Sequence, residues 1–206
     1  MKRYWEKHKR ELILFFVYLA ILPFFEILNR PIGTVHSLLM PIDAKIPFII
    51  EFLPIYHSWF LGLCAYSIYL IHRDPLMSRV LSKTFFWGMI AAYITFIFYQ
   101  TYVPRPVLTG DSFLEKMYRS TLQVDGPYVG FPSCHVLTTW AMMLTMLKRK
   151  KRTLWIGLLW GTLVILSTVF VKQHVFMDIP GGLIYATVLF MIFYKREQQK
   201  LDESNG

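Results

Sequence analysis

The chain has 206 residues, of which 55% are hydrophobic and 17% are charged, and it carries a formal net charge of +9. An ordinary soluble domain has about 25% charged residues, so this composition argues against a protein surrounded by water. The positive charge does not indicate a nucleic-acid partner, because the basic residues lie in short clusters between apolar runs, as they do at the cytoplasmic flanks of membrane helices.

Six apolar runs dominate the chain, and a helix of about 20 apolar residues is long enough to cross the hydrocarbon core of a membrane. We therefore predict an all-α polytopic membrane protein in which residues 1–206 form one domain, with a loose tail at about 201–206. The six predicted transmembrane helices cover residues 12–28, 55–71, 85–103, 133–147, 154–171 and 175–194.

Two segments near the first helices need their own interpretation. The first apolar run follows a basic stretch, as in a secretory signal, but no small-residue cleavage site follows it, so we predict a retained helix. Residues 46–54 are apolar but contain two prolines and a glutamate. We interpret this stretch as an interfacial or re-entrant segment.

The lysines and arginines are concentrated on one side of the predicted helices. Sixteen of the 22 fall in residues 1–10, 73–83, 148–152 and 195–200. The other six are Arg30, Lys45, Arg105, Lys116, Arg119 and Lys172. Because cytoplasmic loops are enriched in lysine and arginine, we expect both termini in the cytoplasm and the loop 102–132 outside. The predicted location is the plasma membrane.

Polar residues that are costly in a membrane gather at three places, residues 102–106, 131–135 and 172–178. Such residues are functional candidates by default. All three segments lie at the outer ends of predicted helices. Topology alone therefore predicts one active site at the outer face of the membrane.

The side chains in these segments are suited to phosphoryl transfer. His174 and Asp178 are four residues apart, so on a helix the carboxylate can hold the imidazole in one tautomer and leave its other nitrogen free as a nucleophile. Ser133 and Cys134 follow a proline at a predicted helix start, where unpaired backbone N–H groups can bind an anion. His135 is near enough to donate a proton to a leaving oxygen.

Each pattern has a simpler interpretation when taken alone. A histidine and an aspartate at this spacing are common by chance. Arg105, between two prolines, can offer its planar guanidinium to a phosphate, but it can equally anchor the chain to lipid headgroups. The joint occurrence of the three segments, in this order and on one side, favours a catalytic site. Nothing in the sequence resembles a metal cage, so we expect no metal and no cofactor.

With these residues in place, the sequence resembles the type 2 phosphatidic acid phosphatase superfamily, whose motifs are Lys-x6-Arg-Pro, Pro-Ser-Gly-His and Ser-Arg-x5-His-x3-Asp. The first is matched at 105–106, the second at 132–135, and the third from Ser167 to Asp178 with its spacing intact. The resemblance implies that His174 attacks phosphorus to give a phosphohistidine, that Asp178 orients it, and that His135 protonates the leaving group. It also implies that no metal is needed.

Three positions depart from the family pattern. Phe98 stands in place of the first lysine, Cys134 in place of the glycine, and Thr168 in place of the arginine. Two of the three cationic phosphate ligands are therefore absent, which leaves Arg105, the helix start at Ser133 and Cys134, and Lys172 to bind phosphate. A less cationic pocket is better suited to a phosphodiester, and the pattern looks like the branch with inositol phosphorylceramide and sphingomyelin synthases.

Three functions remain open from the sequence. The first is a lipid phosphatase that acts on a phosphate monoester or diphosphate, with a lipid phosphate and membrane lipids as its partners and no nucleic acid. The second is a transferase that passes a phosphodiester headgroup to an alcohol. The third is a channel or transporter with a proton relay at His174 and Asp178, which is disfavoured because these residues lie at helix ends and not in mid-membrane. The oligomeric state does not follow from the sequence.

Overall fold

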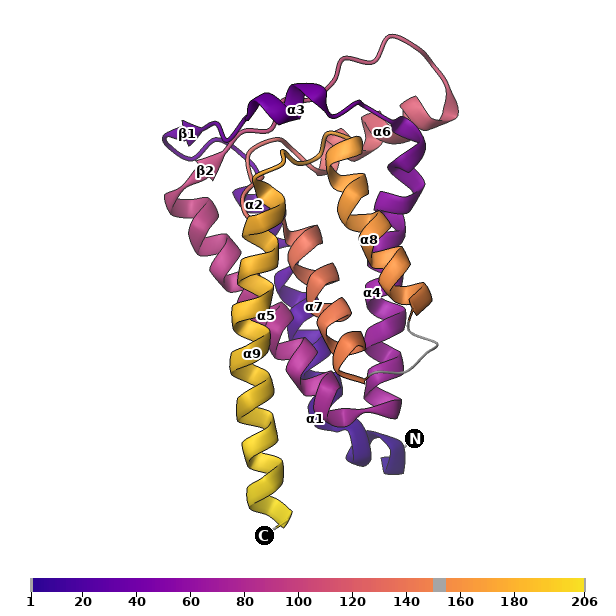
Figure 1. Cartoon of the computed structure of the whole chain (residues 1–206), viewed down its shortest axis with the longest axis vertical. Coiled ribbons are helices and arrows are strands. Elements are labelled where there is room, and N and C mark those ends of the chain that lie inside the picture. Colours follow the sequence, from indigo (N-terminus) through magenta and orange to yellow (C-terminus); the bar gives the residue numbers. More distant parts are fainter. Residues whose placement is uncertain (1, 150–154, 206) are drawn as a thin grey trace.

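The computed structural model describes residues 2–149 and 155–205 as a bundle of long helices that run along a common direction (Figure 1). Figure 1 places α7 in the middle of the bundle, where it contacts α4, α5, α8 and α9. The long helices are α1 (Lys2–Ile21), α4 (Leu53–Arg73), α5 (Pro75–Phe98), α7 (Cys134–Arg149), α8 (Trp155–Phe170) and α9 (Asp178–Asn205). The prediction of an all-α protein is confirmed.

The short elements gather at one end of the bundle, and the chain termini lie at the other (Figure 1). Two strands of two residues each pair in parallel, Val35 with Gln100 and His36 with Thr101. The short elements are α2 (Phe24–Leu28), β1 (Val35–His36), α3 (Pro41–Lys45), the 3-10 helix η1 (Ile50–Phe52), β2 (Gln100–Thr101) and α6 (Phe113–Val124). They form a cap over the helix ends at which the sequence predicts the site.

Several helix boundaries differ from the prediction. α5 begins ten residues before the predicted residue 85, because the Asp74 side chain accepts a hydrogen bond from the Met77 N–H and Pro75 suits the first turn. α6 lies in the loop 102–132, for which no helix was predicted. It starts at a capping box in which Ser112 and Glu115 bind each other's backbone N–H groups. Residues 201–205, predicted as a loose tail, are helical, since α9 continues to Asn205.

Among the described residues, two stretches are long and apolar enough to cross a membrane, His8–Leu28 and Pro75–Phe98, and Trp155–Phe170 is a shorter apolar helix. The six-span layout therefore stays a prediction. Residues 150–154, which hold three of the five basic residues predicted to follow the fourth helix, lie outside the described residues.

Large apolar side chains cover the outside of the bundle as well as its core. The core between α1, α4, α5 and α7 contains the fully buried side chains of Tyr18, Leu63, Phe85 and Leu137. The outward faces of α1, α4, α5, α8 and α9 also expose large apolar side chains. Examples are Phe16, Leu61, Trp87, Ile156 and Met191. Exposed apolar surface spread over five helices is unusual for a monomeric soluble protein.

A cluster of ion pairs joins α1, α5 and α9 at the end that carries the termini. Arg79 donates to Glu11 at 2.7 Å and to Glu197 at 2.8 Å, and Lys83 also pairs with Glu197. Burial alone would raise the pKa of Glu197, but hydrogen bonds from Lys83 and Arg79 lower this pKa to about 2. Glu197 lies beyond the predicted span 175–194.

Candidate active site

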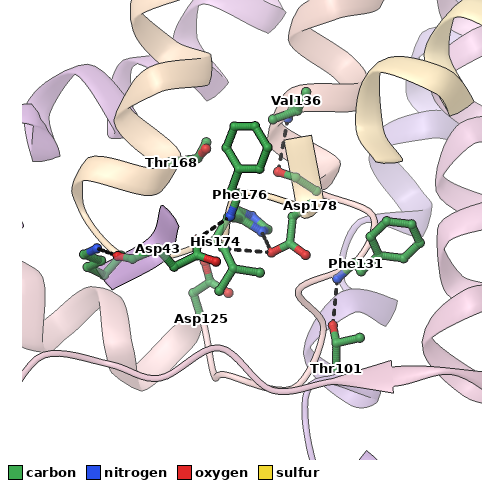
Figure 2. A network of polar contacts seen from close by, with 12 residues as sticks. Asp43, Thr101, Asp125, Phe131, Val136, Thr168, His174, Phe176 and Asp178 are labelled. Carbon is green, nitrogen blue, oxygen red and sulfur yellow. Dashed lines mark hydrogen bonds and ion pairs between the residues drawn. The ribbon is translucent and has the colours of Figure 1, made fainter. Parts of the chain in front are cut away.

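His174 and Asp178 form a buried pair where the loop after α8 enters α9 (Figure 2). The Asp178 Oδ2 lies 3.0 Å from His174 Nδ1 and also accepts a hydrogen bond from the Val175 N–H at 3.0 Å. A carboxylate in this position favours the tautomer with the proton on Nδ1. The Nε2 atom makes no hydrogen bond within the described part of the chain, so its lone pair is available as a nucleophile.

The loop that carries His174 is tied to α3, which is more than 125 residues away in sequence. Asp43 Oδ1 accepts a hydrogen bond from the Phe176 N–H at 2.7 Å, as Figure 2 shows. The ammonium group of Lys172 donates to the carbonyl oxygens of Asp43 at 2.9 Å and Ile46 at 2.6 Å. Burial lowers the pKa of Lys172, and the negative charge of Asp43 raises this pKa by a smaller amount. In this arrangement Lys172 anchors the loop through its side chain.

α6 supports the same loop from another side. The Tyr118 side chain is fully buried, and its hydroxyl donates to the Val171 carbonyl at 2.8 Å. Burial raises the pKa of Tyr118 to about 12, so the hydroxyl keeps its proton as a donor at neutral pH. The His174 and Gln173 N–H groups both donate to the Thr168 carbonyl at 3.0 Å. Backbone and side-chain contacts together hold His174 in one place.

His135 faces His174 across the start of α7, with the two ring centroids 5.8 Å apart. Its ring lies against two aromatic side chains of α4, at 4.4 Å from Tyr56 and 4.3 Å from Trp59. Tyr56 is held by a hydrogen bond of 2.8 Å to Asp125, and Trp59 by one of 2.8 Å to Thr138. The imidazole nitrogens of His135 make no hydrogen bond within the described residues. They are free to reach a leaving oxygen.

The first turn of α7 has the features of an anion site. The Ser133 side chain accepts a hydrogen bond from the Val136 N–H at 3.3 Å, and the Ser133 N–H donates to the Asp178 carbonyl at 3.2 Å. The N–H groups of Cys134 and His135 have no hydrogen-bond partner in the described chain. Free N–H groups at a helix start attract a negatively charged oxygen.

Arg105 lies between the His174 loop and the segment after α6. Its guanidinium donates to the carbonyls of Lys172 at 2.8 Å and Gly126 at 2.9 Å. The Nε–H of Arg105 is buried and has no hydrogen-bond partner among the residues that the structure describes. A buried, unpaired donor calls for an explanation such as a bound ligand, and a phosphate oxygen would satisfy it.

The two positions at which the sequence lacks a cation differ in their surroundings. Thr168 is fully buried beneath the His174 loop, and its hydroxyl donates to the Ile165 carbonyl at 2.7 Å. Phe98 is the last residue of α5 and is 82% exposed. Neither position supplies a positive charge to the site. Arg105, with its unpaired Nε–H, and the start of α7 are the groups described above that are suited to binding phosphate.

A cavity of about 860 Å³ opens beside His135. Its wall includes Tyr56 and Asp125, which the sequence did not single out, together with His57 and Glu26. Among the described residues, no group of three or more His, Cys, Asp or Glu side chains is arranged to hold a metal ion.

One of the comparisons with known proteins identifies a family. A family model described as the PAP2 superfamily matches residues 84–202, the part of the chain that contains Arg105, His135, His174 and Asp178. No curated protein and no solved structure matches the chain.

Proposed function

The chain belongs to the PAP2 superfamily of phosphatases and phosphotransferases, and we propose that it is a membrane-embedded lipid phosphatase that works through a phosphohistidine at His174. The observation that carries this proposal is the pair formed by Asp178 and His174 Nδ1, which leaves Nε2 unpaired beside His135.

In the first half of the reaction, the Nε2 lone pair of His174 attacks phosphorus and the bond between phosphorus and the ester oxygen breaks. His135 in its protonated form gives its proton to the leaving oxygen, which departs as an alcohol. Asp178 keeps the Nδ1–H of His174 bound and stabilises the positive charge that develops on the ring.

In the second half, water attacks the phosphohistidine and gives a proton to His135. The phosphorus–nitrogen bond breaks, phosphate leaves, and both histidines return to their starting states. The Arg105 Nε–H and the free N–H groups of α7 are suited to binding the phosphate oxygens throughout. Lys172 is suited to holding the loop, because its ammonium already binds carbonyl oxygens of residues 43 and 46.

The apolar exterior supports a membrane location, for which we propose six spans. Exposed apolar side chains on α1, α4, α5, α8 and α9 would face lipid. The site lies at the end of the bundle opposite the termini, which agrees with an extracytoplasmic site and cytoplasmic termini in the plasma membrane (Figure 1).

A headgroup transferase is the second candidate, and the residues at 98 and 168 favour it. With Phe98 and Thr168 in place of cations, the site has fewer positive charges for a dianionic monoester. The proton relay of a transporter remains the least favoured function, because the ionisable residues cluster at helix ends.

Purified protein should be incubated with lipid monoesters and diesters, with and without an acceptor alcohol, and with EDTA present in a parallel set. A phosphatase releases phosphate from monoesters without an acceptor, whereas a transferase needs the alcohol. Loss of all activity in EDTA, with recovery on adding zinc or magnesium, would contradict the proposed chemistry.

A further inference from the structure

The cavity beside His135 is lined by residues of six helices, α1, α2, α4, α5, α6 and α7, and its lining is both apolar and polar. Apolar side chains such as Leu22, Phe25 and Met89 form most of its wall. The polar side chains of the lining include His57, Asp125, Glu26, Ser120 and Thr121. Its volume of about 860 Å³ is within the ~300–1,000 Å³ range of small-molecule sites, so it can hold a substantial part of a lipid.

The position of His135 fixes which part of a substrate this cavity can receive. In the proposed reaction, which this inference rests on, His174 attacks phosphorus from one side and His135 protonates the oxygen that leaves on the other. His135 lines the cavity, whereas His174 does not. The group attached to the leaving oxygen therefore occupies the cavity.

The charges of the lining select among leaving groups. Asp125 and Glu26 contribute two carboxylates, and no lysine or arginine is present among the described residues that line the cavity. Asp125 is held in place, because its Oδ2 accepts from the Tyr56 hydroxyl at 2.8 Å and its Oδ1 from the Asn29 amide at 3.4 Å. Arg105 lies nearby but donates to backbone carbonyls, including that of Asp125, and does not line the cavity.

We propose that this cavity is a leaving-group site for an uncharged lipid alcohol, and that Asp125 and Glu26 exclude a leaving group that carries its own phosphate. A lipid monophosphate releases a neutral alcohol into the cavity. A lipid diphosphate would release an alkyl phosphate, whose negative charge would lie against two carboxylates, and such like-charge contacts strongly disfavour binding. The enzyme is then specific for monophosphates over diphosphates.

The test compares hexadecyl phosphate with hexadecyl diphosphate, which share one apolar chain. We expect wild-type kcat/KM to be at least about tenfold higher for the monophosphate, a modest ratio for repulsion between like charges. The variants Asp125→Asn and Glu26→Gln, and the double variant, should raise the diphosphate rate relative to the monophosphate rate by about tenfold. Glu51→Gln removes an exposed carboxylate outside the cavity and should leave the ratio unchanged. An unchanged ratio in the double variant, or a wild-type preference for the diphosphate, overturns the proposal.

Equilibrium binding of the same two radiolabelled lipids to the His174→Ala protein separates this proposal from the proposed function. If the His174→Ala protein binds the monophosphate more tightly than the diphosphate, and the double variant loses this difference, the cavity assignment is supported. This holds even if the wild type hydrolyses neither lipid, and that lack of hydrolysis would refute the phosphatase proposal. If the wild type hydrolyses both lipids with equal kcat/KM, the cavity assignment is refuted and the phosphatase proposal is not. If Asp125→Asn does not fold, the exposed Glu26→Gln carries the test by itself.

Discussion

The ring centroids of Trp59 and His135 lie 4.3 Å apart. The Trp59 Nε1–H also donates a hydrogen bond of 2.8 Å to the hydroxyl of Thr138, which lies one turn after His135 on α7. The two histidines of the site are therefore held in different ways. A carboxylate orients His174, whereas aromatic packing orients His135.

This packing predicts that Trp59→Phe slows the reaction at the leaving-group step. Loss of the hydrogen bond frees the ring, and a small misplacement of an acid can cost about tenfold or more in kcat. The loss should be larger for an alkyl phosphate than for p-nitrophenyl phosphate, because a good leaving group needs no proton. Trp140→Phe is the matched control, since it loses a similar hydrogen bond, to Thr187, outside the cavity lining. Equal losses for both substrates would contradict a role through His135.

The hydrogen bond between Asp43 of α3 and the loop that carries His174 predicts that Asp43 holds this loop in position. In Asp43→Asn, one carboxylate oxygen becomes an NH2 group facing a backbone N–H, either of Met40 or of Phe176. Leaving a buried N–H unpaired costs about 1–3 kcal/mol, so the melting temperature should fall. The kcat should fall more than KM rises, because His174 is displaced. Asp111→Asn removes an exposed carboxylate and serves as the control. An unchanged kcat in a folded Asp43→Asn protein would show that Asp43 does not position His174.

The lowered pKa of Glu197 predicts a loss of stability in acid. A carboxyl group whose pKa is lower in the folded than in the unfolded protein stabilises the fold above its unfolded pKa. This contribution is lost as the pH falls from ~4.5, near the unfolded value, to about 2, the folded value. Thermal unfolding in detergent between pH 5 and pH 3 should therefore show a smaller drop in melting temperature for Glu197→Gln than for wild type. Identical pH dependence of the two proteins would show that Glu197 is not the group responsible.

The proposed orientation predicts which surface residues a membrane-impermeant reagent can reach. In intact cells, with Cys64 and Cys134 replaced, Lys116→Cys on α6 should be labelled and Lys200→Cys on α9 should not. Both side chains are exposed, so burial does not protect either one. The reverse pattern would place the site in the cytoplasm.

The sequence predicted the parts of this structure that depend on local patterns. α4, α7 and α8 lie within about two residues of the predicted runs. His174 and Asp178 are in contact as predicted, but His174 lies in the loop before α9 and not on the same helix as Asp178. The helices were predicted from hydrophobicity alone, which does not detect helix starts. The capping box of α6 and the Asp74–Pro75 start of α5 are local sequence patterns that would have predicted these starts.

The partners of the catalytic residues could not be predicted in the same way. Asp43 reaches Phe176 across 133 positions, and Trp59 reaches Thr138 across 79. No periodicity links such positions, because helix packing brings them together. For Lys172, the local sequence and the structure point to different partners. Its position next to the third motif suggested a phosphate ligand, but its ammonium group donates to the carbonyl oxygens of Asp43 and Ile46.

The measurement that most directly tests the account is the trapping of a phosphoenzyme. Wild-type protein mixed with 32P-labelled lipid monophosphate and quenched in alkali should carry label on the peptide that contains His174. The label should be acid-labile, absent from His174→Ala, and still present in His135→Ala when an activated aryl phosphate is the donor. An active enzyme that carries no label on His174, or a His174→Ala variant that still turns over substrate, would contradict the central claim.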